Sequence, residues 1–273
     1  MTEQAAVLHD AALPASRHAR RGWLALLRPW VFPALLLGLY EAYARRAAAL
    51  GSEALAPPSA ALKALAGAAA DGSLWRATGF TLGTAALGLL LGALLGIGLG
   101  LLLGLSRRAA RLSLLSIEVL RPVPSVALIP LAMLMFGFGV RMELCIVAFA
   151  TFWPMLILVQ SAVQQVEPRL LEVSRVLGLT ARERAWKIVL PAIVPRLFVA
   201  LRLGVAVASV VAVTVEIAAN PNGMGYAMMI AQQSFEPALM LAWLVWIGVV
   251  GFVINAAMLR LQRVVARRMG ALP

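Results

Sequence analysis

Long stretches without charged residues dominate this chain, and their lengths suit membrane-spanning helices. About 20 apolar residues are needed to cross the hydrocarbon core of a bilayer as a helix. Four such stretches carry no charge, at 77–106, 122–140, 144–166 and 237–259. Two more, at 23–43 and 191–219, carry a few charges. The pattern predicts an all-α fold, a polytopic membrane bundle of about six transmembrane helices.

The composition supports a membrane protein and excludes a soluble globule. Of the 273 residues, 62% are hydrophobic and 13% are charged, and the mean hydropathy is +0.89. So little polar surface could not cover a water-soluble domain of this size. The net charge of +12 would suggest nucleic-acid binding in a soluble protein, but basic residues also gather in the cytoplasmic loops of membrane proteins.

The positions of the basic residues predict the orientation of the chain. If both termini are cytoplasmic, most of the 24 lysines and arginines fall in inside segments. The outside segments then hold only Arg45, Arg46, Lys63, Arg76 and Arg141. This asymmetry favours cytoplasmic N- and C-termini. Residues 31–40, followed by alanines at 47–49, also have the form of a signal peptide, but the long basic leader favours an uncleaved helix.

The segment between the first two spans predicts a short external helix. Residues 54–74 are rich in alanine, carry Pro57 and Pro58 near their start, and place Leu62 and Leu65 on one helix face. A plain linker is the alternative for this segment.

The second span carries glycines at intervals of four residues. Residues four positions apart share a helix face, so the glycines form a bare stripe along which another helix can approach closely. The five positions are Gly88, Gly92, Gly96, Gly100 and Gly104. The stripe predicts tight helix packing and carries no information about a substrate.

Three prolines mark the third span. Pro122, Pro124 and Pro130 each remove a backbone donor, which at membrane depth is tolerated only where protein or water satisfies the freed carbonyls. The pattern predicts a kinked interior helix, or an ordinary proline kink. We expect the charged segment 111–121 before it to lie in the cytoplasmic interface.

The longest inside loop, residues 167–190, predicts two short helices that meet at a glycine. Leu170 and Val173 recur at helical spacing after Pro168, and Gly178 supplies a left-handed stop. Thr180 with Glu183 then forms a capping box that starts a second helix. Such a loop is a docking surface for a soluble partner, or an interfacial helix pair lying on anionic lipid.

This loop resembles the EAA loop of the permeases of type I ABC importers. The shared pattern is Glu172, Gly178 six residues later, and then Leu190-Pro191. The chain departs from that pattern at the two alanines, where it has Val173 and Ser174. The resemblance implies that these six residues form an ATPase-coupling loop.

Other segments resemble the nitrate, sulfonate, taurine and bicarbonate branch of these permeases. They are residues 121–131 with Phe136-Gly137, and 216–219 with 223–226. The resemblance implies three regions: residues 1–74 with the N-terminal tail, first helix and external linker, a permease core at 75–262, and a basic C-terminal tail at 263–273.

The resemblance also implies partners and excludes chemistry in this chain. Such permeases pair with a second permease copy, bind two ABC ATPase subunits, and receive solute from a binding protein at a bacterial inner membrane. ATP and Mg are expected in the partner ATPase, because the sequence has no phosphate loop, and we expect no cofactor, metal or enzymatic activity here. The histidines, His9 and His18, lie in the N-terminal tail, and Cys145 is expected to be a packed core thiol.

Three polar residues of the fifth span are candidates for the translocation path. They are Arg202, Glu216 and Asn220. A charge near the bilayer centre is costly, so Arg202 and Glu216 are each expected to face protein or water. The alternatives are a structural bond from Arg202 to loop carbonyls and a helix cap formed by Glu216. The cargo stays open among nitrate, sulfonates, taurine, bicarbonate and heterocyclic vitamin precursors. A secondary transporter or channel that works alone is the alternative from a different class.

Overall fold

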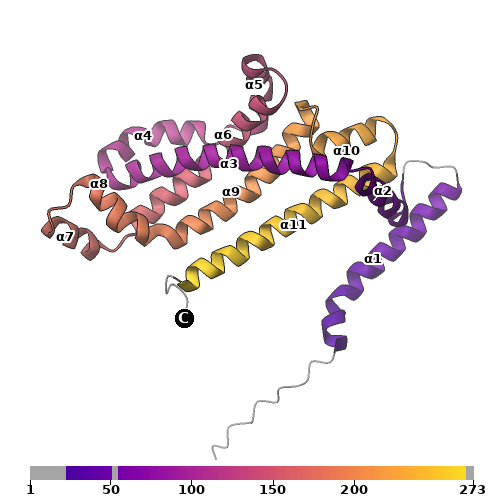
Figure 1. The fold of residues 1–273 in the computed structure, drawn as a ribbon, viewed down its shortest axis with the longest axis horizontal. Coiled ribbons are helices and arrows are strands. Elements are labelled where there is room, and N and C mark those ends of the chain that lie inside the picture. The colour runs from indigo at the N-terminus through magenta and orange to yellow at the C-terminus, as the bar shows by residue number, and fades with distance from the viewer. Residues whose placement is uncertain (1–22, 51–54, 269–273) are drawn as a thin grey trace, which may run out of the picture.

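The computed structural model describes residues 23–50 and 55–268, and every regular element in those ranges is helical (Figure 1). The elements are α1 (Trp23–Ala49), α2 (Pro58–Ala70), α3 (Ser73–Leu105), α4 (Arg107–Leu120), the 3₁₀ turn η1 (Ser125–Leu128), α5 (Ile129–Phe136), α6 (Val140–Gln164), α7 (Pro168–Val176), α8 (Ala181–Arg184), the π-helical turn η2 (Ala185–Val189), α9 (Leu190–Ala219), α10 (Met224–Gln233) and α11 (Pro237–Arg268).

Four helices in the described ranges are long and apolar enough to cross a membrane. They are α3, α6, the continuous helix that ends in α9, and α11, which match four of the six predicted spans. The first predicted span does form α1, but that helix is not among the four, and the charges of Glu41, Arg45 and Arg46 lie in its last turns. In Figure 1, α7 and α8 lie at one end of the bundle and α2 and α10 at the other.

The segment between α3 and α6 is a bent pair of helices. α4 and the η1–α5 segment are bent by 81° relative to each other. The predicted kinked span over 122–140 is therefore present as the shorter helical segment 125–136, which could cross a membrane only together with α4. Pro122 and Pro124 follow the end of α4 and cannot donate to a helix ladder. Figure 1 shows α4 beside the half of α3 nearer to α8. Charged residues of α4, such as Arg111 and Glu118, interrupt its apolar pattern. The sequence pattern therefore does not indicate that α4 belongs to a membrane-crossing segment.

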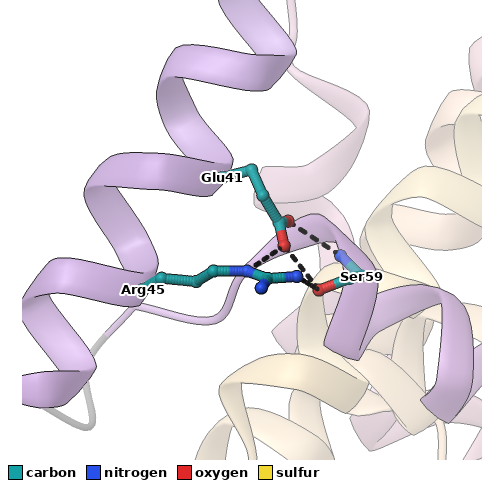
Figure 2. Close-up of polar contacts among 3 residues, drawn as sticks. All are labelled: Glu41, Arg45 and Ser59. Carbon is teal, nitrogen blue, oxygen red and sulfur yellow. Dashed lines mark hydrogen bonds and ion pairs between the residues drawn. The ribbon is translucent and has the colours of Figure 1, made fainter.

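A polar contact joins α1 to α2 (Figure 2). Glu41 Oε2 accepts a hydrogen bond from the Ser59 amide at 3.0 Å, and its Oε1 accepts from the Ser59 hydroxyl at 2.6 Å. Arg45 Nε donates to the same Oε1 at 2.6 Å. Because Ser59 lies in the first turn of α2, the carboxylate of Glu41 satisfies an amide that the helix leaves free.

α2 is packed into the bundle, so the alternative of a plain linker is wrong. Its Ala68 is buried in a cluster with Leu74 of α3, Met224 of α10 and Trp243 of α11. A second cluster fills the centre between α3, α6 and α9 and includes Ala85, Val147 and Ala212. The packing of α3, α6 and α9 therefore forms the rigid part on which the loop helices are mounted.

Candidate functional site

The loop between α6 and α9 folds as two short helices that meet at a glycine. α7 ends before Gly178, whose φ of +65° is left-handed. The amide of Leu179 donates to the carbonyl of Ser174 at 3.0 Å, which is the long-range bond of a Schellman helix stop. The left-handed stop predicted at this glycine is confirmed.

The capping box at the start of α8 is also confirmed. The amide of Glu183 donates to Thr180 Oγ1 at 3.3 Å, and the amide of Thr180 donates back to Glu183 Oε2 at 3.0 Å. Lys187 Nζ donates to Glu183 Oε1 at 3.0 Å one helical turn later. These local bonds fix the direction in which the chain leaves Gly178, because both free amides of the turn are satisfied.

The loop presents apolar side chains to the outside of this chain from α7, from the turn after α7 and from η2. Val173, Val176, Leu177 and Trp186 are exposed, with Trp186 exposed to 66% and Val176 to 88%. Glu172 lies exposed among them, whereas Ser174 is buried. We define these four apolar residues together with Glu172 as the coupling surface. Large apolar groups exposed side by side mark a protein or membrane interaction site.

The base of the loop is anchored on the end of α6. Val189 and Ile193 are buried against Val159 and Val163, and Leu190 packs against the same cluster. Arg196 Nη1 donates to the carbonyl of Ala162 at 3.4 Å. Pro191 follows Leu190 directly after the π-helical turn η2, inside the continuous helix 182–219, and contributes no amide to it. Buried contacts therefore fix the base of the loop to α6 and α9.

The glycine stripe of α3 lies against α6. A β-carbon at Gly88 would lie 2.6 Å from Val147 Cβ, and one at Gly96 would lie 2.7 Å from Met155 Cβ. At Gly100 it would lie 2.8 Å from the carbonyl oxygen of Leu156. The same overlap occurs at Gly92 with Thr151 and at Gly104 with Val163. The absence of side chains along this face is thus required for the observed helix separation.

Glu216 caps the N-terminus of α10. The amide of Gly225 donates to Glu216 Oε2 at 2.8 Å, and the amide of Met224 donates to Thr81 Oγ1 at 2.9 Å. A β-carbon at Gly223 would overlap the Glu216 carboxylate. A carboxylate is favoured at a helix N-terminus by the free amides and the helix dipole. The glycines at 223 and 225 therefore leave the room that the Glu216 side chain occupies.

A second buried carboxylate, Glu143, was missed at the sequence level. Its Oε1 accepts from Thr84 Oγ1 at 2.5 Å, and its Oε2 accepts a short hydrogen bond from Asn220 Nδ2. Glu143, Glu216 and Asn220 are at most 1% exposed. Glu143 stands just before the charge-free stretch 144–166, so the sequence predicts a loop position for it. A single acidic residue beside an apolar stretch was the one sign of its buried position. The roles of Glu216 and Asn220 in the translocation path stay predictions.

Arg202 bonds to a neighbouring helix. Its Nε donates to Asn255 Oδ1 of α11 at 3.2 Å. Its role in the translocation path likewise stays a prediction.

Cys145 is exposed on this chain, so its expected core position is wrong. Within residues 23–50 and 55–268, no group of three His, Cys, Asp or Glu is placed to hold a metal ion.

The long apolar helices, with a capped two-helix loop at one end, define a multi-pass membrane subunit. Residues 88–271 match the family described as the inner membrane component of binding-protein-dependent transport systems. The chain belongs to this family.

Its relatives include named transport permeases. A protein named as an aliphatic sulfonates transport permease, SsuC, of Escherichia coli (strain K12) is 30% identical over 88% of this chain and 91% of its own length. The protein of the same name from Bacillus subtilis (strain 168) is 30% identical, and the match spans 66% of this chain and 65% of that relative. The taurine transport system permease protein TauC of Escherichia coli (strain K12) is 28% identical over 54% of each chain.

A solved structure has the same fold. An inward-facing structure of the MetNI methionine ABC transporter superposes with a TM-score of 0.61 at 20% identity. The superposition covers 68% of this chain and 92% of the other. At this identity the likeness establishes the fold alone.

Proposed function

We propose that this chain is the membrane-spanning permease of an ATP-driven importer for a small organic anion of the sulfonate and taurine class. Its membership of the binding-protein-dependent family supports the importer, and the printed names of its sulfonate and taurine relatives support the cargo class. The coupling surface is the observation that carries the proposal, because it leaves apolar groups and Glu172 uncovered on two capped helices.

In the proposed complex, two copies of this chain pair, two ABC ATPase subunits bind the coupling surfaces, and a binding protein delivers solute at the opposite end. ATP and Mg are held by the ATPase subunits. The end of the bundle with α7 and α8 faces the cytoplasm together with both chain termini; residues 1–22 and 269–273 lie outside the described residues. Closure of the ATPase dimer shifts a two-state bundle through the anchored base of the loop.

The experiment is a charge reversal on the coupling surface. The permease is co-expressed with an ABC ATPase subunit from the same genome, and Glu172→Lys is compared with Glu236→Lys, an exposed acid at the opposite end of the bundle. We expect Glu172→Lys to lose the ATPase on purification and to lose ATP-driven uptake of ethanesulfonate into proteoliposomes. The control should keep the ATPase on purification. Uptake by the permease without any ATPase would instead show a stand-alone transporter.

A further inference from the structure

A cavity of about 430 Å³ lies where the broken segment between α4 and η1 meets α6 and α9. Arg121 and Ser125 line it from the break, and Trp153 lines it from α6. The remaining wall is apolar and includes Ile157, Leu203 and Val207. Among the described residues that line this cavity, Arg121 carries the only charge.

The cavity lies midway along two of the apolar helices. Trp153 is near the centre of α6, and Leu203 and Val207 are near the centre of α9. The expectation that Arg121 lies in a cytoplasmic interface is therefore wrong. α4 leads back from the end of α3 and stops before Pro122, which leaves Arg121 beside the middle of the bundle. A cation in such apolar surroundings is costly unless an anion or water meets it.

Trp153 lines this cavity and also the neighbouring cavity between α3, α4 and α6. Trp153 is 9% exposed, and its Nε1 has no hydrogen-bond acceptor among the described residues. An indole N–H can only donate, and leaving it unbonded when buried costs free energy. Phe149 and Phe152 hold the ring edge-on at centroid distances of 5.6 and 4.9 Å. Trp153 Nε1 is therefore a donor that an acceptor in the cavity could satisfy after a small shift of the ring.

We propose that this cavity is a binding site in the membrane-spanning part for an organic anion with a short apolar tail, such as an alkanesulfonate. The anionic oxygens bind the Arg121 guanidinium and accept from Trp153 Nε1, with the Ser125 hydroxyl as a further donor. The tail packs against Leu203 and Val207. Charge-assisted bonds from arginine to such oxygens are strong, and the cavity volume is in the range of small-ligand sites. This site rests on the proposed function, since it deepens the cargo class of the same importer.

The test measures ATP-driven ethanesulfonate uptake by the full complex in vesicles of phosphatidylcholine alone, which removes anionic lipid as a ligand. We expect Arg121→Gln to lower uptake about tenfold or more and Trp153→Phe about threefold or more, with assembly and basal ATPase unchanged. Arg121→Lys should retain more uptake than Arg121→Gln. The controls Arg108→Gln and Trp75→Phe alter exposed residues outside the cavity and should match the unmodified complex.

Two outcomes of the uptake assay overturn the site, and they are distinguishable. If the unmodified complex takes up ethanesulfonate and both variants match it, the site is wrong while the proposed function stands. If the unmodified complex takes up no sulfonate, the cargo class fails and the site fails with it. Should an Arg121 variant not assemble, Ser125→Cys in a Cys145→Ser background gives an independent measure. Ethanesulfonate should slow its maleimide labelling several-fold, and unchanged labelling would also overturn the site.

Discussion

Gly92 of α3 lies so close to Thr151 of α6 that a β-carbon at position 92 would overlap the threonine hydroxyl. The same β-carbon would lie 2.5 Å from the carbonyl oxygen of Ala148, so the neighbouring backbone would also have to move. Gly98 is in the same helix, but a β-carbon there would meet nothing within 4 Å. Substituting each of these two glycines by alanine therefore separates the effect of helix packing on stability from the effect of helix propensity.

We expect Gly92→Ala to destabilise the permease by about 1–3 kcal/mol, because inserting a methyl group forces packed helices apart. Gly98→Ala should be neutral or stabilising by up to about 1 kcal/mol, because alanine favours the helix. Thermal unfolding of both variants in detergent measures the difference. Equal midpoints for the two would show that the stripe has no packing role.

Thr84→Val tests the buried cluster around Glu143. The change keeps the shape of the side chain but removes the hydroxyl that donates to Glu143 Oε1, so we expect a loss of about 1–2 kcal/mol in stability. Thr214→Val is the control, since the Thr214 hydroxyl bonds to the Val210 carbonyl of its own helix at 2.8 Å. Comparable unfolding midpoints for the two variants would contradict a stabilising role for the Glu143 bond.

Gly178→Val tests the turn between the two loop helices. Its positive φ resists a β-branched side chain at a cost of about 1 kcal/mol or more, although a β-carbon would meet nothing within 4 Å. We expect ATP-driven uptake to fall while membrane insertion survives. Gly178→Asn should retain most uptake, because asparagine tolerates the left-handed region. Normal uptake and ATPase copurification with valine would show that the turn is not needed for coupling.

Arg202→Gln tests whether the bond to Asn255 holds α9 and α11 together. We expect Arg202→Gln and Asn255→Leu to lower stability by similar amounts, about 0.5–1.5 kcal/mol each. Unfolding midpoints and uptake should be measured for both, and for Arg202→Lys. A role in the translocation path predicts the opposite pattern, with stability unchanged, uptake lost in Arg202→Gln and kept in Arg202→Lys.

Local patterns were sufficient to predict much of the fold and of the coupling loop. Charge-free length placed three of the four spans, α3, α6 and α11, and low charge placed α9. The capping box at Thr180 and the stop at Gly178 depend on residues within about one helical turn. Such features are determined by backbone geometry near each residue, so sequence spacing is enough to find them.

The contacts inside the bundle could not be predicted in this way. Glu143 bonds to Thr84 and Asn220 across sequence separations of 59 and 77 residues, and no periodicity encodes such pairs. The sequence predicts an interfacial position for Arg121 because this residue ends the charged segment 111–121, directly before an apolar stretch. Its position beside the middle of α6 depends on how α4 packs, which only the three-dimensional arrangement shows.

The glycine stripe also restricts which parts of the protein can move against each other. Backbone contact between α3 and α6 from Gly88 to Gly104 covers about 24 Å of helix at a rise of about 1.5 Å per residue. Because α3 and α6 interlock over that length, they cannot slide past each other or bend apart, and they behave as one rigid unit. The base of the loop is packed on this unit through Val189 and Ile193, which are buried against Val159 and Val163 of α6. A movement that starts at the loop would therefore have to carry α3 and α6 together rather than bend either helix alone.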